Sequence, residues 1–378
     1  MIITLTAAVA TVSGMLMAFE SLRKYSHMLS SLLLMIFFYL LVGGNSDNAD
    51  YLNYVWTYQG SSDFTWDRFG YWAYYLTIAF CRNLGLDFVS YRLIMYGIGF
   101  LFLFLFMRKV VGWSPLFLFF YFIFPMGIDA TQMKNFVAMT ILAYAFTFLC
   151  SSSVKDNIFY YLLVLLASGF HVVFLIFLPV PFFRRALSIR YFSVIFWTIV
   201  LSMIILLSTG PGNTAFMTFL GTIAPDDLMD KQALYLNQSV RFGYIIFLIA
   251  NILTTVGLRY VWKVANQSLT ATITERNFIH LAYICSLYSF LFFPFYMFTL
   301  EFARFFRDLF PIFHAAIVIA LNVMCPKYLT ITVKQILLLG CYLILLFYMG
   351  IFVIYNVFDS TVIPLFQGVS RVLCKSIQ

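Results

Sequence analysis

The chain has 378 residues, of which 63% are hydrophobic and only 10% are charged, with a formal net charge of +8 and a mean hydropathy of +0.94. A soluble domain carries roughly 25% charged residues, so this composition excludes a water-soluble protein and indicates a polytopic, all-α integral membrane protein. The basic residues lie singly or in pairs between apolar runs, where they set topology rather than bind nucleic acid. The six cysteines are scattered, without the spacing of a zinc site or a disulfide framework.

The membrane spans are predicted from apolar segments, since a helix needs about 20 apolar residues to cross a bilayer. The first, 2–19, precedes Arg23 and Lys24 and is expected to be a signal anchor rather than a cleaved peptide. The other candidate spans are 28–43, 89–107, 113–127, 135–150, 191–209, 243–262, 278–299, 309–325 and 335–356. The shorter aromatic segment 70–80 predicts an interfacial or re-entrant helix. Without repeats or a linker, residues 1–378 are predicted to form one membrane domain of about 10–12 transmembrane helices.

The orientation follows from the excess of Lys and Arg in cytoplasmic loops. With Arg23 and Lys24 inside, the predicted outward loops are those near 44–88, 128–134, 210–242 and 300–308. The apolar stretch 158–183 conflicts with this scheme, because a single span would place the arginines that follow it outside. We therefore predict a broken or re-entrant helix near 157–183, with the break at 168–171, where Gly169 and a polar His171 suit backbone that lines a cavity.

Ten basic residues do not face inward on this scheme, against the topology rule, and three of them are candidate catalytic residues. Arg304 and Arg307 are three residues apart, on one helical face, and Lys134 begins a span. Ionisable groups at membrane depth cost about 2.5–3.5 kcal/mol and are usually paired or functional. Two arginines and a lysine near one face of the membrane are suited to bind a phosphate or diphosphate. The alternative is internal pairing, for example of Arg307 with Asp308.

His171 and the segment 45-NSDNADYLNYVWTYQG-60 are the other candidates. His171 interrupts a long apolar stretch and is a candidate general base, the alternative being a structural histidine. The segment combines tyrosines, which stack on sugars, with Asp50, a candidate acceptor for a sugar hydroxyl proton; Asp67 is another. The alternative for the aromatic residues is an interfacial belt. Asp47 and Asp50 alone make a poor metal site, so no metal or other cofactor is expected.

The order of these motifs resembles the EpsG-like polysaccharide polymerases, which are Wzy-type enzymes of O-antigen, capsule and exopolysaccharide assembly. The resemblance covers roughly residues 40–310. The matching motifs are Asp50-Tyr51-Leu52-Asn53-Tyr54, Asp67-Arg68-Phe69-Gly70-Tyr71, Lys134-Asn135-Phe136-Val137-Ala138, Gly169-Phe170-His171 and Arg304-Phe305-Phe306-Arg307. The family usually has Glu in place of Asp67 and Arg-Gln in place of Lys134-Asn135.

The resemblance implies a glycosyltransferase that acts on the outer face of the bacterial cytoplasmic membrane. Its donor would be a growing chain on undecaprenyl diphosphate, and its acceptor a lipid-linked repeat unit. Lys134, Arg304 and Arg307 would stabilise the diphosphate leaving group, and Asp50 or His171 would be the base. The residues expected to bind the sugar substrate are Tyr51, Tyr54, Asp67, Arg68, Tyr71 and Asn135. Besides membrane lipid, a chain-length regulator protein is an implied partner.

Two further functions fit the same membrane class. A lipid-linked oligosaccharide flippase would also need a basic cavity, but the paired halves typical of transporters are not visible in the sequence. Another lipid-sugar glycosyltransferase, such as an O-antigen ligase, would use the same donor. Nucleotide-binding motifs are absent from the sequence, so the energy is expected to come from an activated, membrane-borne substrate.

Overall fold

The computed structural model describes residues 23–45, 48, 50–60, 70–151, 153–208, 243–297, 300–324 and 332–354, and these residues are helical apart from short connections. The α-helices are α2 (Arg23–Gly43), α3 (Tyr51–Gly60), α4 (Trp72–Asn83), α5 (Phe88–Val110), α6 (Pro115–Ile123), α7 (Met126–Asp129), α8 (Met133–Phe146), α9 (Val154–Phe170), α10 (Val180–Ala186), α11 (Phe192–Ser208), α14 (Gly243–Gln267), α15 (Ile273–Tyr288), α16 (Arg304–Arg307), α17 (Phe310–Val323) and α18 (Val333–Ile354). The 3₁₀ helices are η3 (Thr147–Cys150), η4 (Val172–Phe177), η5 (Ser289–Leu291), η6 (Phe293–Met297) and η7 (Leu300–Ala303).

Six helical segments in the described part of the chain are long and apolar enough to cross a membrane. They are Tyr25–Gly43, Phe88–Val110, Met133–Cys150, Gly243–Gln267, Arg304–Val323 and Val333–Val353. This confirms the predicted all-α membrane class. The candidate span 2–19 lies outside the described residues. The helix α4, with 12 residues, is about 18 Å long and too short to span, as expected for the aromatic segment 70–80.

Two predicted spans are interrupted, one of them at a proline. Within 113–127, α6 ends at Ile123, because Pro125 lacks the N–H that would continue the ladder and disfavours helical geometry at Phe124. Within 278–299, α15 ends at Tyr288 and is followed by the short 3₁₀ turns that contain Pro294. Both segments are therefore short helical pieces rather than single continuous helices.

The predicted break at residues 168–171 is confirmed. The helix α9 ends at Phe170, and His171 is extended, with φ −150° and ψ 109°. The chain then returns alongside α9, where the Tyr160 hydroxyl donates to the Phe177 carbonyl at 2.6 Å. At the foot of the hairpin, the Arg184 side chain donates to the carbonyl of Leu149, close to the start of α9.

The centre of the bundle is the pair α5 and α8, which run parallel. Asp87 caps α5 by accepting from the backbone N–H of Ser90 at 2.9 Å. The two helices meet at Gly99, where an added Cβ would lie only 2.3 Å from the Phe136 ring. A glycine is therefore needed for this close approach.

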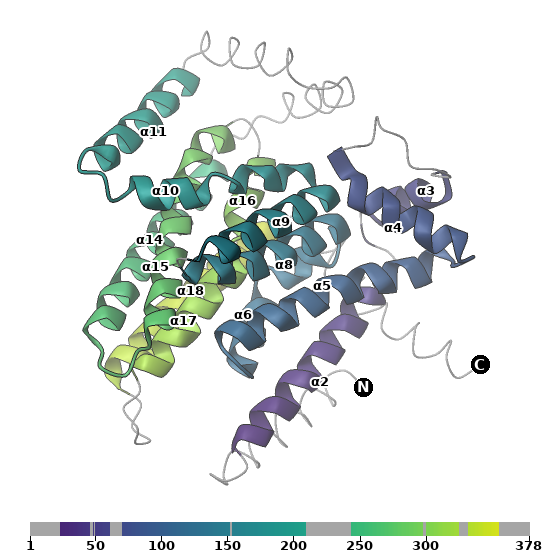
Figure 1. Ribbon diagram of the computed structural model, residues 1–378, viewed down its shortest axis with the longest axis horizontal. Coiled ribbons are helices and arrows are strands. Elements are labelled where there is room, and N and C mark those ends of the chain that lie inside the picture. Colours follow the sequence, from purple (N-terminus) through teal and green to yellow (C-terminus); the bar gives the residue numbers. More distant parts are fainter. Residues whose placement is uncertain are drawn as a thin grey trace.

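The two ends of the helical bundle are named here after Lys134 and Lys109. The Lys134 end holds the N-termini of α5 and α8 and the C-terminus of α9, and the Lys109 end holds their opposite termini. In Figure 1, α3 and α4 lie beside one end of α5, whereas α14, α15, α17 and α18 form a second group in green to yellow, which packs against α6. The Tyr51 and Tyr58 rings of α3 pack against Phe88, so α3 lies at the Lys134 end.

Candidate functional site

Three tyrosine rings surround the side chain of Lys134 in the first turn of α8. The Lys134 ammonium lies 4.7 Å from the ring centroid of Tyr71, 5.0 Å from that of Tyr74 and 5.9 Å from that of Tyr54. Each distance is within the roughly 6 Å range of a cation–π contact. Tyr54 comes from α3 and Tyr74 from α4, and Tyr71 directly precedes α4. We call Lys134 and these three residues the tyrosine cage.

The hairpin brings His171 to the same place. The His171 ring lies 5.9 Å from the Tyr71 ring, edge to face. This approach depends on Gly169, because an added Cβ there would lie 2.5 Å from the Trp72 indole and 2.8 Å from the Cβ of Ala73. The glycine two residues before the histidine thus lets α9 pack directly on α4.

Asp50 adds a carboxylate close to the cage. It directly precedes α3, and its carbonyl accepts from the N–H of Tyr54 at 3.1 Å. Burial, followed by the negative charge of Asp50, raises the pKa of the Tyr54 hydroxyl well above its usual value, while the backbone N–H of Lys134 acts in the opposite direction. Tyr51 lies apart from the cage, with its ring 5.3 Å from the guanidinium of Arg92.

The other face of the first turn of α8 contacts α16 and the residue after it. The Asn135 amide donates to Oδ1 of Asp308 at 2.8 Å, and Nη2 of Arg307 donates to Oε1 of Gln132 at 2.6 Å. Arg307 and Asp308 also form an ion pair, with Nη2 and Oδ1 3.6 Å apart. Arg307, Asp308 and Asn135 are only 5%, 1% and 3% exposed. Two hydrogen bonds therefore join segments more than 170 residues apart in the sequence.

Asp129 is a buried acid next to this network that sequence reasoning missed. Its Oδ2 accepts from the Tyr121 hydroxyl at 2.9 Å, and its Oδ1 has no partner among the described residues. Burial raises the pKa of the Asp129 carboxyl to about 7; the charge of Arg307 opposes this shift, and that of Asp308 adds to it. The sequence signal was present, since Asp129 is an acid in the predicted outward loop 128–134.

Two other basic residues on the predicted outward side have structural roles. Arg82 donates to the carbonyls of Tyr58 and Gln59 at 3.1 and 2.9 Å, at the C-terminus of α3. Arg92 donates to the carbonyl of Val42 at 3.0 Å, in the last turn of α2. Cations suit helix C-termini, whose carbonyls lack partners within the helix. These two arginines thus stabilise the helices that flank the loop containing Asp50.

Some predicted site residues are not among those brought together. Asp67, Arg68 and Asp47 lie outside the described residues. Arg304 is half-buried and stands one turn before Asp308, whose N–H donates to the Arg304 carbonyl at 2.8 Å. In the described part of the chain, His, Cys, Asp and Glu do not gather in groups of three or more that would hold a metal.

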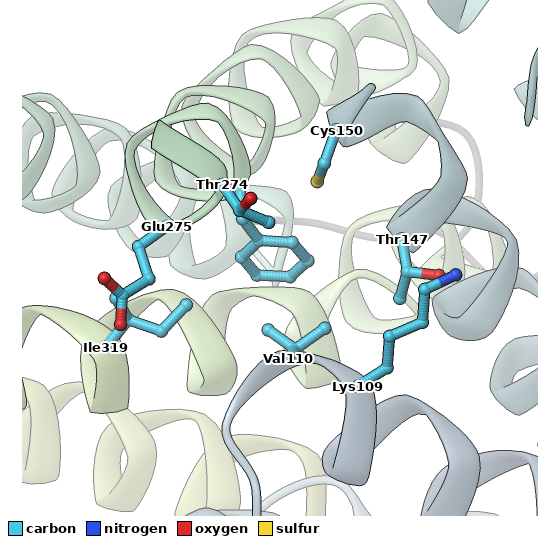
Figure 2. A pocket seen from close by; sticks show the side chains of 8 residues that line it. Lys109, Val110, Thr147, Cys150, Thr274, Glu275 and Ile319 are labelled. Carbon is cyan, nitrogen blue, oxygen red and sulfur yellow. The ribbon is translucent and has the colours of Figure 1, made fainter. Parts of the chain in front are cut away.

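A small cavity of about 60 Å³ lies at the other end of the bundle. It is lined by Lys109, Val110, Thr147, Cys150, Thr274, Glu275, Phe278 and Ile319. Figure 2 shows Lys109 and Glu275 on opposite sides of it, with the sulfur of Cys150 pointing inward. Arg92 and Lys109 are 17 positions apart in α5, which is roughly 25 Å along the helix. This cavity is therefore separate from the tyrosine cage and too small for a sugar.

The family model described as the EpsG family matches residues 3–366, nearly the whole chain. No curated protein and no solved structure matches the chain. Four of the five motifs that carry the resemblance have a described residue at the cage, namely Tyr54, Tyr71, Lys134 and His171. Arg307 of the fifth motif contacts Gln132 and Asp308 instead.

Proposed function

Because the chain belongs to the EpsG family of polysaccharide polymerases, we propose that it joins lipid-linked oligosaccharide repeat units into a surface polysaccharide. The donor is a growing chain on undecaprenyl diphosphate, and the acceptor is a single repeat unit on the same lipid. The reaction takes place on the outer face of the bacterial cytoplasmic membrane. The observation that carries this proposal is the convergence of Lys134, three tyrosines and His171 from four separate segments of a membrane protein.

In the proposed reaction, one bond forms and one bond breaks at the anomeric carbon of the donor sugar. A sugar hydroxyl of the acceptor forms a bond to the anomeric carbon of the donor chain, and the bond from that carbon to the diphosphate oxygen breaks. The hydroxyl proton passes to His171 or Asp50, and the lipid diphosphate leaves with the electron pair. Lys134 stabilises the charge that develops on this leaving group.

The surrounding residues supply binding. The rings of Tyr54 and Tyr71 lie beside Lys134 and offer apolar surface on which a sugar can stack. Arg304, half-buried next to the buried Arg307–Asp308 pair, is a second cation for the diphosphate. Membrane lipid solvates the undecaprenyl chain alongside the spanning helices.

The test is complementation of cells that lack the gene. Variants Lys134→Ala, Lys134→Arg and His171→Ala are compared with the wild type by the length distribution of surface polysaccharide, after expression is checked. We expect the null cells to carry single repeat units, and the two alanine variants to lose the ladder by a factor of about 100 or more, the typical effect of removing a charge-stabilising or acid–base group. Lys134→Arg retains the charge and should retain part of the ladder.

Lys155→Ala is the matched control, since it removes an exposed lysine near the Lys109 end and should leave the ladder intact. Accumulation of repeat units on the cytoplasmic leaflet of the null cells would contradict the proposal, because it would indicate a flippase. If the null cells instead contain long lipid-linked chains that are not transferred to the surface anchor, the protein is a ligase.

A further inference from the structure

Arg307, which the resemblance predicts to bind a diphosphate, is buried against the protein together with Asp308. Arg307 is 5% exposed, its Nη2 donates to Gln132, and its partner Asp308 is 1% exposed. The guanidinium therefore donates into the protein through Nη2, while its buried Nε has no partner among the described residues. The contact of this pair is with the first turn of α8, and that turn also carries Lys134.

The geometry of that turn separates two functions. Gln132 directly precedes α8 and Asn135 lies in its first turn, and the two side chains contact Arg307 and Asp308 respectively. Lys134 points to a different face and lies among the rings of the tyrosine cage. Any rotation of the turn that loosens the first set of contacts moves Lys134 relative to its tyrosines.

We propose that Arg307 and Asp308 clamp the first turn of α8, and that Asp308 and Asn135 are positioning residues which hold Lys134 in the tyrosine cage. This inference rests on the proposed function only where it links the cage to polymerisation. The clamp itself is a statement about structure. Its hydrogen bond from Asn135 to Asp308 joins a neutral amide to a buried carboxylate, and such charge-assisted bonds are among the stronger ones in proteins.

A charge swap tests the clamp. Asn135→Asp removes the amide donor and sets two carboxylates against each other, whereas Asn135→Asp combined with Asp308→Asn restores the bond with donor and acceptor exchanged. The matched control is Asn251→Asp, the same chemical change at a residue of α14 that is 0% exposed and accepts from Ser289 at 3.0 Å. That control lowers stability without touching α8.

The first readout is the acetylation rate of Lys134 by an N-hydroxysuccinimide ester at pH 8, measured by mass spectrometry relative to the exposed Lys155. We expect Lys134 to react at least about threefold faster in Asn135→Asp, the fold-change that corresponds to losing one cation–π contact. The swap should return to the wild-type rate, and Asn251→Asp should not differ from it. An unchanged rate in Asn135→Asp overturns the clamp. If Asn135→Asp does not accumulate in cells, the double variant is tested instead. A double variant that accumulates and shows the wild-type acetylation rate supports the clamp. A double variant that does not accumulate, or that shows a different rate, overturns it.

The second readout is the polysaccharide ladder in the same cells, and it separates the two proposals. A faster rate at Lys134 together with a lost ladder that the swap restores supports both. A faster rate with an intact ladder supports the clamp and contradicts the role of Lys134 in polymerisation. An unchanged rate with a lost ladder overturns the clamp and leaves the proposed function supported by the complementation test alone.

Discussion

At the scale of the single residue, Asp129 makes the stability of the protein depend on pH. Burial raises the pKa of its carboxyl to about 7, whereas an aspartate in an unfolded chain titrates near 3.9, or roughly pH 4. Between these values the folded protein holds a proton that the unfolded chain has lost. The free energy of unfolding therefore falls as the pH rises from about 4 to about 7 and loses nothing further from this group above that.

Asp129→Asn removes this titration while it keeps the size of the side chain. We measure the melting temperatures of the variant and the wild type in detergent. We expect the value for the variant minus the value for the wild type to increase as the pH rises from 5 to 8. Asp87→Asn is the control, because the hydrogen bonds from Ser90 lower the pKa of that exposed carboxyl; its difference from the wild type should stay flat between pH 5 and pH 8 and change with the opposite sign only below about pH 4. The Asp87 contribution is present at neutral pH and is lost as the pH falls through its lowered pKa. A pH-independent difference for Asp129→Asn would mean that Asp129 is ionised in the fold.

At the scale of the helical element, two glycines with different surroundings make a matched pair. Gly169→Ala places a Cβ within 2.8 Å of Trp72 and Ala73, so α4 and α9 must separate. Overpacking of this kind costs typically 1–3 kcal/mol. We expect a clearly lower melting temperature together with loss of the ladder, since the same contact sets the distance between His171 and Tyr71.

Gly97→Ala is the control for helix propensity, because its nearest neighbour, a ring atom of Tyr39, would lie at an ordinary 3.9 Å. Alanine is the better helix former by roughly 1 kcal/mol, so this variant should be as stable as the wild type or more stable. Equal melting temperatures for the two variants would show that the close packing of α9 on α4 is not required.

The hairpin could be predicted from the sequence because its signals are local. Glycine, histidine and the arginines after residue 183 lie within one stretch, and the topology rule applied to them has one economical solution. The contacts of Arg307 and Asp308 with the first turn of α8 could not be predicted, because no periodicity relates segments that are about 170 residues apart. Tyr74 was missed for a different reason: a tyrosine in an aromatic helix carries no signal for the cation that it contacts.

At the scale of the whole molecule, the fold fixes which segments share a side of the membrane, and the positive-inside rule then predicts which side that is. Arg184 lies next to Leu149, and the Asn277 amide in the second turn of α15 donates to the Cys150 carbonyl at 3.0 Å, so the connections before α9, after α10 and before α15 belong to the Lys109 end. The exposed Trp56 of α3 belongs to the Lys134 end. We propose that the Lys134 end faces outward.

Single cysteines in a cysteine-free background measure this arrangement directly. Trp56→Cys should react with a membrane-impermeant maleimide on intact cells, whereas Ser188→Cys and Ser268→Cys should react only after permeabilisation. The hairpin is tested by Ser153→Cys and Ser188→Cys, which lie before and after it. If the chain returns at His171, both cysteines react from the same side of the membrane. If these two reacted from opposite sides, residues 154–186 would cross the membrane once and the return of the chain at His171 would be wrong. If all four reacted from the side opposite to that predicted, the hairpin would stand. The tyrosine cage would then face the cytoplasm, where the proposed polymerisation of exported repeat units does not take place.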